Sequence, residues 1–302
     1  MLKRIVSCAI IATFALGMLA SCGLEIQAGD GMRSVVATIF APYDFARSVA
    51  GGLAEVTMLL PPACESHAFE PTPQDIIRIL HCDVFIYVGG ESDAWVERIL
   101  STMDTSGMRV VTLMDCVDTV EEEGGDGEQD EHVWTSPGNA KRITQRISEA
   151  MCGADPQNAA AYRRNTAAYL AELDALDAQF RTVVDGAARK AVVFGDRFPF
   201  RYFMDAYGLV YAAAFPGCAA ETEASAGTVL ALVEKIKTEG IPAVFHTELS
   251  NENMARAIGK ETGAKVLLLH ACHNISRADF QAGRTYLDLM GDNVEALREA
   301  LG

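Results

Sequence analysis

The sequence lacks an excess of positive charge. It carries 25 Lys and Arg residues against 41 Asp and Glu residues, a net charge of -16 over 302 residues. Nucleic-acid-binding proteins usually present a basic face, so we set this function class aside. With 50% hydrophobic and 22% charged residues, the composition is that of a folded globular chain, long enough for one large domain or two medium ones.

The apolar run at the N-terminus, residues 5–19, is too short for a comfortable membrane span. It follows two basic residues and leads into "LASC", which ends at Cys22 and resembles a bacterial lipobox. This pattern predicts a lipoprotein signal peptide over residues 1–21, a lipidated Cys22 and a tether over residues 22–32, with an ordinary signal peptide as the alternative. We therefore expect an extracytoplasmic protein that a lipid anchors to the bacterial membrane.

The chain also lacks several signatures of catalytic and zinc-finger sites. It has no HExxH and no GxSxG, which argues against a hydrolase, and no CxxC pair, which argues against a thiolate zinc site. Six of the eight cysteines lie beyond the predicted lipidation site, at Cys64, Cys82, Cys116, Cys152, Cys218 and Cys272. Export permits disulfides among them, but the sequence does not give their connectivity, and buried free thiols are the alternative.

Short apolar segments alternate with helix-like segments along the rest of the chain. Those that resemble β-strands cover residues 34–40, 55–60, 84–90, 109–115, 190–196, 210–215, 243–249 and 265–270. Such an alternation predicts parallel sheets with helices on both faces, here in two halves.

Between the halves, residues 157–185 contain neither proline nor glycine and are rich in Ala, Leu, Glu and Arg. They predict one amphipathic helix about 40 Å long. We therefore predict an α/β fold of two lobes, each with a parallel sheet flanked by helices, joined by one long rigid α-helix. The lobes cover residues 33–154 and 189–302, and the linking helix residues 155–188.

Most of the six histidines fall just after a predicted strand. In parallel α/β sheets, ligands bind outside the carboxyl ends of the strands. His67, His132 and His270 occupy such places, and His273 lies one turn beyond His270. Imidazoles that converge from several loops are typical of a metal site. The other two histidines, His246 within a strand and His81 at the end of a helix, are interpreted as structural.

The stretches "PPACESHAFEPTPQDI", "DEHVWTSPGNAKRI" and "FRYFMDAYGL" resemble the zinc/manganese solute-binding proteins of bacterial ABC importers, from about residue 33 to 301. The resemblance implies two lobes on one long helix, with a Zn²⁺ or Mn²⁺ ion in the cleft between them. It implies His67, His132 and His270 as metal ligands. The third ligand position of the family falls on Arg197, which cannot donate a lone pair.

Because of that departure, Asp196 and His273 are possible additional ligands, and Arg197 could instead pair with a carboxylate. Glu70 is expected to support His67 from behind through a hydrogen bond. The family's metal-rich loop falls on residues 121–131, where this chain carries acids. We expect these residues to form a solvated loop or to collect cations weakly.

The function implied by the resemblance is capture of a divalent metal and its delivery to an ABC permease with its ATPase subunit. The protein would be a monomer and not an enzyme. Because imidazole suits zinc and carboxylate suits manganese, we expect Zn²⁺ rather than Mn²⁺. The alternatives are a zinc-dependent hydrolase with a histidine-rich site, and a manganese-specific binding protein or adhesin.

Overall fold

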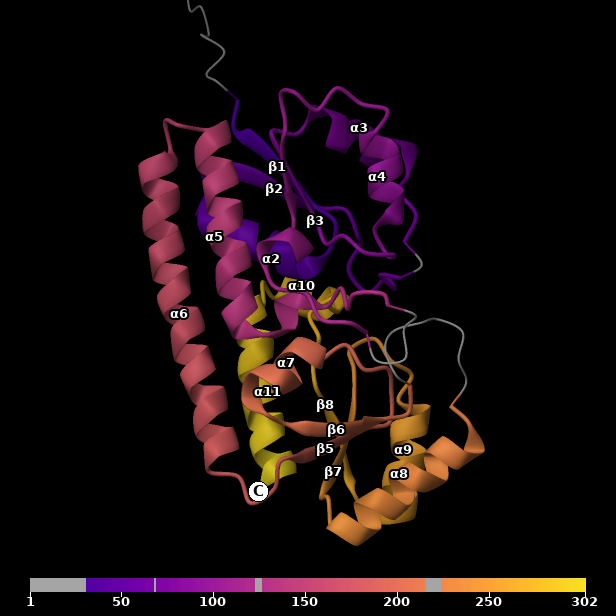
Figure 1. Ribbon diagram of the computed structural model, residues 1–302. Coiled ribbons are helices and arrows are strands. Elements are labelled where there is room, and N and C mark those ends of the chain that lie inside the picture. Colours follow the sequence, from indigo (N-terminus) through magenta and orange to yellow (C-terminus); the bar gives the residue numbers. More distant parts are fainter. Residues whose placement is uncertain (1–30, 68, 123–126, 216–223) are drawn as a thin grey trace, which may run out of the picture. The chain divides into compact units, whose positions relative to one another are not determined.

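The computed structural model describes residues 31–67, 69–122, 127–215 and 224–302 (Figure 1). The predicted signal peptide and Cys22 lie outside these residues, so their assignment stays a prediction. None of the helices in the described ranges combines the length and the hydrophobicity that a bilayer span requires. The cysteines in these ranges are free thiols, namely Cys64, Cys82, Cys116, Cys152 and Cys272, and Cys218 lies outside them.

Four parallel strands form the sheet of the N-terminal lobe, in the order β2-β1-β3-β4. They are β1 (Arg33–Ala37), β2 (Ala54–Met58), β3 (Val84–Tyr87) and β4 (Arg109–Thr112). Successive side chains point to opposite sides of a strand, and here both sides are covered. Val36 and Phe85 pack with α3 (Pro73–His81) and α4 (Ala94–Leu100). Val35 and Ile86 belong to the core on the other face, with α2 (Phe40–Ala50) and α5 (Pro137–Ala154).

The C-terminal lobe repeats this arrangement with a parallel sheet in the order β6-β5-β7-β8. Its strands are β5 (Ala191–Phe194), β6 (Val210–Ala213), β7 (Ala243–His246) and β8 (Lys265–Leu268). Its helices are α7 (Arg201–Tyr207), α8 (Ala226–Glu239), α9 (Asn253–Thr262), α10 (Arg277–Gln281) and α11 (Tyr286–Leu301). Helices α8 and α9 pack on one face of the sheet and α11 on the other (Figure 1). The predicted α/β fold with two parallel sheets flanked by helices is confirmed.

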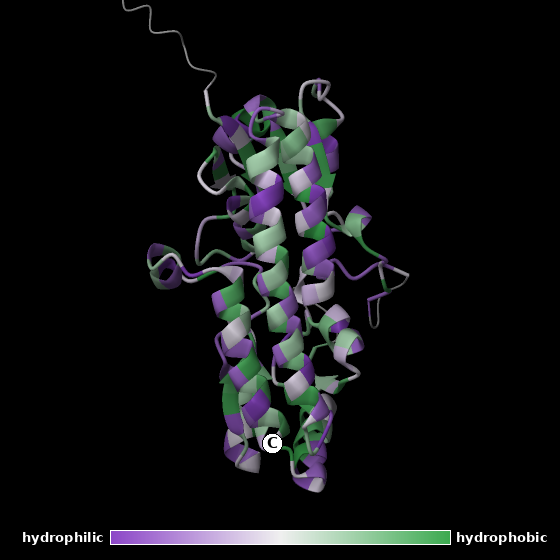
Figure 2. Cartoon of the chain, turned by 90° about the vertical axis from the view of Figure 1, so that its left-hand side faces the viewer, coloured by the Kyte–Doolittle hydropathy of each residue, from purple (hydrophilic) through white to green (hydrophobic). Residues whose placement is uncertain are grey.

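The long helix is α6 (Ala159–Asp185), inside the segment in which the sequence predicted it. Its buried residues recur every three or four positions and include Tyr162, Thr166, Tyr169, Leu173, Leu176 and Phe180. The 18-residue helix α5 lies antiparallel beside it and was not predicted (Figure 1). In Figure 2 this side of the molecule faces the viewer, and hydrophilic residues alternate with hydrophobic ones along the two helices. Each helix therefore buries one stripe and exposes another.

Helix α6 packs against both lobes. Near its N-terminal half, the ring of Tyr169 contacts Phe45 of α2, with centroids 6.2 Å apart. Near its C-terminal end, Phe180 contacts Phe203 of α7 edge to face at 4.9 Å. The largest cluster of buried hydrophobic residues contains side chains from both sheets. Because the core does not divide between the lobes, the predicted boundaries at residues 154 and 189 stay a prediction.

Candidate metal centre

Three imidazoles meet where loops from the two sheets come together. His67 lies in the loop after β2, His132 in the segment after β4 and His273 in the loop after β8. Their ring centroids lie 5.9 Å apart for His67 and His132, 5.3 Å for His67 and His273, and 4.7 Å for His132 and His273. One ligand atom of each residue lies within 4.8 Å of the other two. A small inward shift would give all three the zinc–nitrogen distance of about 2.0–2.1 Å.

A serine and a carboxylate hold His67 in place. Its Nδ1 lies 2.8 Å from Ser92 Oγ and 3.5 Å from Glu131 Oε1. Glu131 also accepts hydrogen bonds from the backbone N–H of Ser92, at 3.2 Å, and from its hydroxyl. Burial alone would raise the pKa of Glu131, but the interactions with His67, His132 and Ser92 outweigh it and lower the pKa to about 2. The Glu131 carboxylate that faces His67 Nδ1 is therefore ionised.

The loop that carries His67 is fixed on both sides of the histidine. On its N-terminal side, the backbone N–H of Ala63 donates to Ile275 O at 2.9 Å. Asn274 Nδ2 donates to the carbonyls of Pro61 and Cys64, at 2.8 and 2.7 Å. On its C-terminal side, α3 begins with a capping box and a proline in its first turn. These contacts preorganise the loop.

His132 is the most deeply buried of the three, with 2% of its surface exposed. Its Nδ1 lies 2.9 Å from Asp130 Oδ1, and the same oxygen accepts a hydrogen bond from the His132 backbone N–H at 2.8 Å. The Tyr202 hydroxyl of the C-terminal lobe donates to the Asp130 carbonyl at 2.6 Å. The segment that presents His132 is thereby fixed to the opposite lobe.

His273 faces Glu248, which follows strand β7. Its Nδ1 lies 3.6 Å from Glu248 Oε1, and its backbone N–H donates to that oxygen at 3.0 Å. The Nε2 atom of His273 is buried and has no hydrogen-bond partner among the described residues. Burial lowers the pKa of His273 to about 4, even though Glu248 opposes this shift. At neutral pH the imidazole is uncharged and Nε2 can donate its lone pair to a metal ion.

In each of the three histidines, Nδ1 faces a carboxylate. A carboxylate at Nδ1 favours the tautomer with the proton on that nitrogen and the lone pair on Nε2. Such carboxylate–histidine pairs orient imidazole ligands in metal sites and raise their basicity. Three imidazoles backed by three acids can bind a dication, and they suit zinc by ligand type.

His270, predicted as a ligand, is not one of the three histidines of the cluster. Its backbone N–H donates to Asn293 Oδ1 at 2.7 Å, and its Nδ1 accepts a hydrogen bond from the Cys272 N–H at 3.0 Å. Cys272 adopts a left-handed conformation with φ of 60°, which turns the chain so that His273 faces the other imidazoles. The expectation that His270 would outrank His273 is therefore corrected: His270 builds the turn, and His273 reaches the cluster.

The other predicted site residues also lie outside the cluster. Asp196 Oδ2 accepts hydrogen bonds from Thr247 N at 3.0 Å and from Thr247 Oγ1 at 3.1 Å, so it joins two loops. Arg197 pairs with Glu65 at 3.6 Å, as the sequence analysis allowed. Glu70 is exposed to solvent, and the carboxylate beside the His67 ring is that of Glu131 instead. His246 and His81 are not members of the cluster either.

The acids that support the imidazoles were not predicted from the sequence. Asp130 and Glu131 end the segment that was expected to be a solvated acidic loop, yet Asp130 is only 3% exposed. Their direct proximity to His132 in the sequence was the available signal. Glu248 also had a signal, because it follows strand β7 at the same sheet edge as the histidines.

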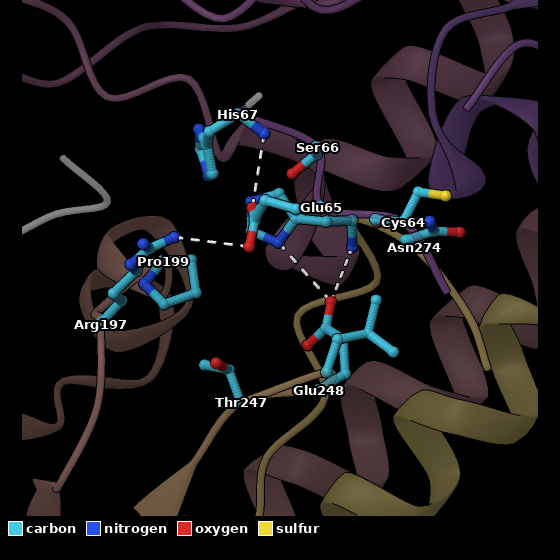
Figure 3. A pocket seen from close by; sticks show the side chains of 11 residues that line it. Cys64, Glu65, Ser66, His67, Arg197, Pro199, Thr247, Glu248 and Asn274 are labelled. Atoms are coloured by element: carbon cyan, nitrogen blue, oxygen red, sulfur yellow. Dashed lines mark hydrogen bonds and ion pairs between the residues drawn. The ribbon is translucent and has the colours of Figure 1, made fainter. Parts of the chain in front are cut away.

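A pocket opens beside His67 and His273 (Figure 3). Residues of both lobes line it, including Glu65, Ser66, Arg197, Thr247 and Glu248. The labelled side chains of Glu65 and Arg197 point toward each other across it, and the Glu248 carboxylate lies on the side of the C-terminal lobe.

The chain is similar to known zinc-binding proteins. The chain is 29% identical over 302 residues to the zinc-binding lipoprotein AdcA of Streptococcus pneumoniae, covering 96% of this chain and 60% of that protein. It is 27% identical to the high-affinity zinc uptake system protein ZnuA of Bacillus subtilis, covering 98% and 96% of the two chains. The chain therefore spans less than two thirds of the streptococcal relative.

Among solved structures, the Zn(II)-bound ZnuA-like domain of Streptococcus pneumoniae AdcA superposes with a TM-score of 0.77, at 27% identity, over 90% of this chain and 99% of that one. The metal-dependent lipoprotein YcdH of Bacillus subtilis superposes with a TM-score of 0.79, at 28% identity, over 89% and 99%. A family model described as the zinc-uptake complex component A, periplasmic, matches residues 35–300. The chain belongs to this family of zinc-uptake complex components.

Proposed function

We propose that this protein is an extracytoplasmic solute-binding protein that captures Zn²⁺ through His67, His132 and His273 and delivers it to an ABC importer. One observation carries the proposal: three imidazoles from both lobes converge, and each has a carboxylate at Nδ1. The names of the relatives support zinc as the cargo. Three nitrogen donors favour Zn²⁺ over Mn²⁺, which prefers oxygen ligands.

The residues around the imidazoles fit a site that binds and releases a metal ion better than they fit the active site of a zinc hydrolase. A zinc hydrolase needs a metal-bound water and a general base beside it. Among the described residues, the carboxylates nearest the imidazoles are Asp130, Glu131 and Glu248, and each faces an imidazole nitrogen. We therefore propose that the protein is not an enzyme.

The membrane attachment and the partners follow from the predicted lipobox and from the family. We propose that lipid on Cys22 anchors a monomer to the bacterial membrane, where it meets the permease and the ATPase subunit of a zinc importer. Cys22→Ala should release the protein from the membrane fraction or block its processing. Membrane association of that variant at the processed mass would contradict the lipid anchor.

Zinc affinity tests the proposed cargo. We expect the purified mature protein to bind one Zn²⁺, measured by competition with a chromophoric chelator, and to bind Mn²⁺ much more weakly. His67→Ala and His132→Ala should each weaken zinc binding strongly, whereas His81→Ala, on the surface end of α3, should leave it unchanged. If neither of the first two variants weakens binding, these residues do not form the metal centre.

A further inference from the structure

Arg197 and Glu65 form an ion pair between the two lobes. Arg197 lies in the loop after β5 and Glu65 in the loop after β2, two residues before His67. Arg197 Nη1 is 3.6 Å from Glu65 Oε2, and both side chains line the pocket that contains His67 and His273 (Figure 3). The pair therefore spans the space beside the imidazoles.

Each member of the pair is connected to the backbone of a functional loop. Glu65 Oε1 accepts a long hydrogen bond, 3.4 Å, from the backbone N–H of His67. On the other side, Asp196 Oδ1 accepts from the Arg197 N–H at 2.9 Å, and its Oδ2 accepts from Thr247 N–H at 3.0 Å. The ion pair thus connects the backbone of a metal-binding histidine to the end of β7 in the other lobe.

The pair lies at the solvent side of the pocket. The side chains of Arg197 and Glu65 are 32% and 54% exposed, whereas those of His67 and His273 are each 14% exposed. Other contacts between the lobes near this site are buried, such as the Trp134 Nε1 hydrogen bond to the Ala271 carbonyl at 2.7 Å. A solvent-exposed ion pair is weaker than buried hydrogen bonds of this kind, so it should open first.

The N-terminal part of the His67 loop cannot move easily, because residues 61–64 are bonded to residues 274 and 275 of the other lobe. Glu65 is the next residue along the chain, and its contact with Arg197 is the exposed one. Opening at Glu65 would clear the side of His67 that lines the pocket, while Ser92 and Glu131 keep the ring in place and the lobes stay together. A local motion of this kind has a lower barrier than separation of a shared core.

We propose that the Arg197–Glu65 ion pair is a latch that closes the mouth of the metal pocket and sets the rates at which Zn²⁺ enters and leaves. This inference rests on the proposed zinc binding at the three histidines. The pair also balances charge: Glu65 neutralises the guanidinium, which would otherwise repel a dication in the pocket that it lines. Loss of Glu65 should therefore weaken equilibrium binding slightly, whereas loss of Arg197 should not.

Stopped-flow transfer of Zn²⁺ from the loaded protein to excess chelator tests the latch. We expect Arg197→Gln and Glu65→Gln each to release zinc about 1.5- to 5-fold faster, the range for an exposed ion pair. The double variant should release it no faster than the faster single variant, because both remove the same contact. High salt should accelerate release from the wild type but much less from the variants.

Arg256→Gln is the matched control, since it breaks an exposed Arg–Glu pair with Glu252 at 2.6 Å on α9, away from the pocket. Arg197→Lys, which keeps the charge, should restore part of the slow release. The latch proposal would be wrong if both single variants released zinc at the wild-type rate. It would also be wrong if the rate increases of the two single variants multiplied in the double variant. Neither result would contradict zinc binding at the histidines. Failure of the wild type to bind zinc would instead overturn the proposed function, and the latch with it.

Discussion

Replacement of His273 by alanine should remove one of the three imidazoles of the metal site. Structural zinc sites have apparent binding free energies of about 10–16 kcal/mol. Divided among three imidazoles and one further ligand, this gives about 2.5–4 kcal/mol for each, or roughly a 70- to 900-fold loss of affinity. We expect the loss of affinity to reach this range. His273 Nε2 is buried without a hydrogen-bond partner among the described residues, and no other histidine of the described residues belongs to the cluster with His67 and His132.

His270→Asn is the matched comparison. His270 Nδ1 accepts a hydrogen bond from Cys272 N–H at 3.0 Å, and the side-chain oxygen of asparagine can accept the same bond. We therefore expect zinc affinity within about fivefold of the wild type, since a slightly perturbed hydrogen bond changes the free energy by ~1 kcal/mol. His270→Ala would be a poorer comparison, because it leaves the buried Cys272 N–H without an acceptor.

Both variants can be measured by competition with a chromophoric zinc chelator at pH 7.5, after circular dichroism and thermal melting have shown that each is folded. The expected order of affinity is wild type, then His270→Asn close to it, then His273→Ala far below. The opposite order, with tight binding by His273→Ala and loss of binding by His270→Asn, would refute the assignment of His273 and restore His270 as the ligand.

The buried carboxylates should control zinc affinity and acid stability. Glu248→Gln should weaken zinc binding about 10- to 100-fold in the chelator assay, because it removes the negative charge that faces His273 Nδ1; an unchanged affinity would contradict this role. The pKa values of Glu131 and Glu248 are lowered from 4.5 to about 2 in the folded chain, so the unfolded chain takes up protons first as the pH falls. The free energy of unfolding of the metal-free protein should therefore decrease from about pH 4.5 towards pH 2 in urea titrations, and Glu248→Gln should flatten that decrease. Burial raises the pKa of Asp44 to about 6, so its charge is destabilising above that pH. Asp44→Asn should stabilise the protein by about 1–2 kcal/mol at pH 7.5 and by less at pH 4, where wild-type Asp44 is neutral; equal effects at both pH values would argue against an electrostatic cause.

Local sequence determined the elements whose signals lie within a few residues. Helix α3 has such signals, because Thr72 caps it, Pro73 fills its first turn and an apolar stripe follows. The long helix α6 was predicted because no helix breaker interrupts its composition. Helix α5 was missed, and Gly138 and Asn139 in its first turn weaken the local helix signal. Its packing against α6 supplies the stability that its own sequence does not.

The sequence by itself identified the chemistry of the site, since the histidines at strand ends and the family motifs pointed to a metal ion between two lobes. Only the tertiary structure decided between His270 and His273, which lie three residues apart and follow the same strand. Which of them faces the other imidazoles depends on the left-handed turn at Cys272 and on the bonds of His270 to its surroundings. The fold likewise brought Glu131 to His67 and Glu248 to His273, because the two residues of each pair lie far apart in sequence. Long-range packing brings such residues together, and local patterns in the sequence do not encode it.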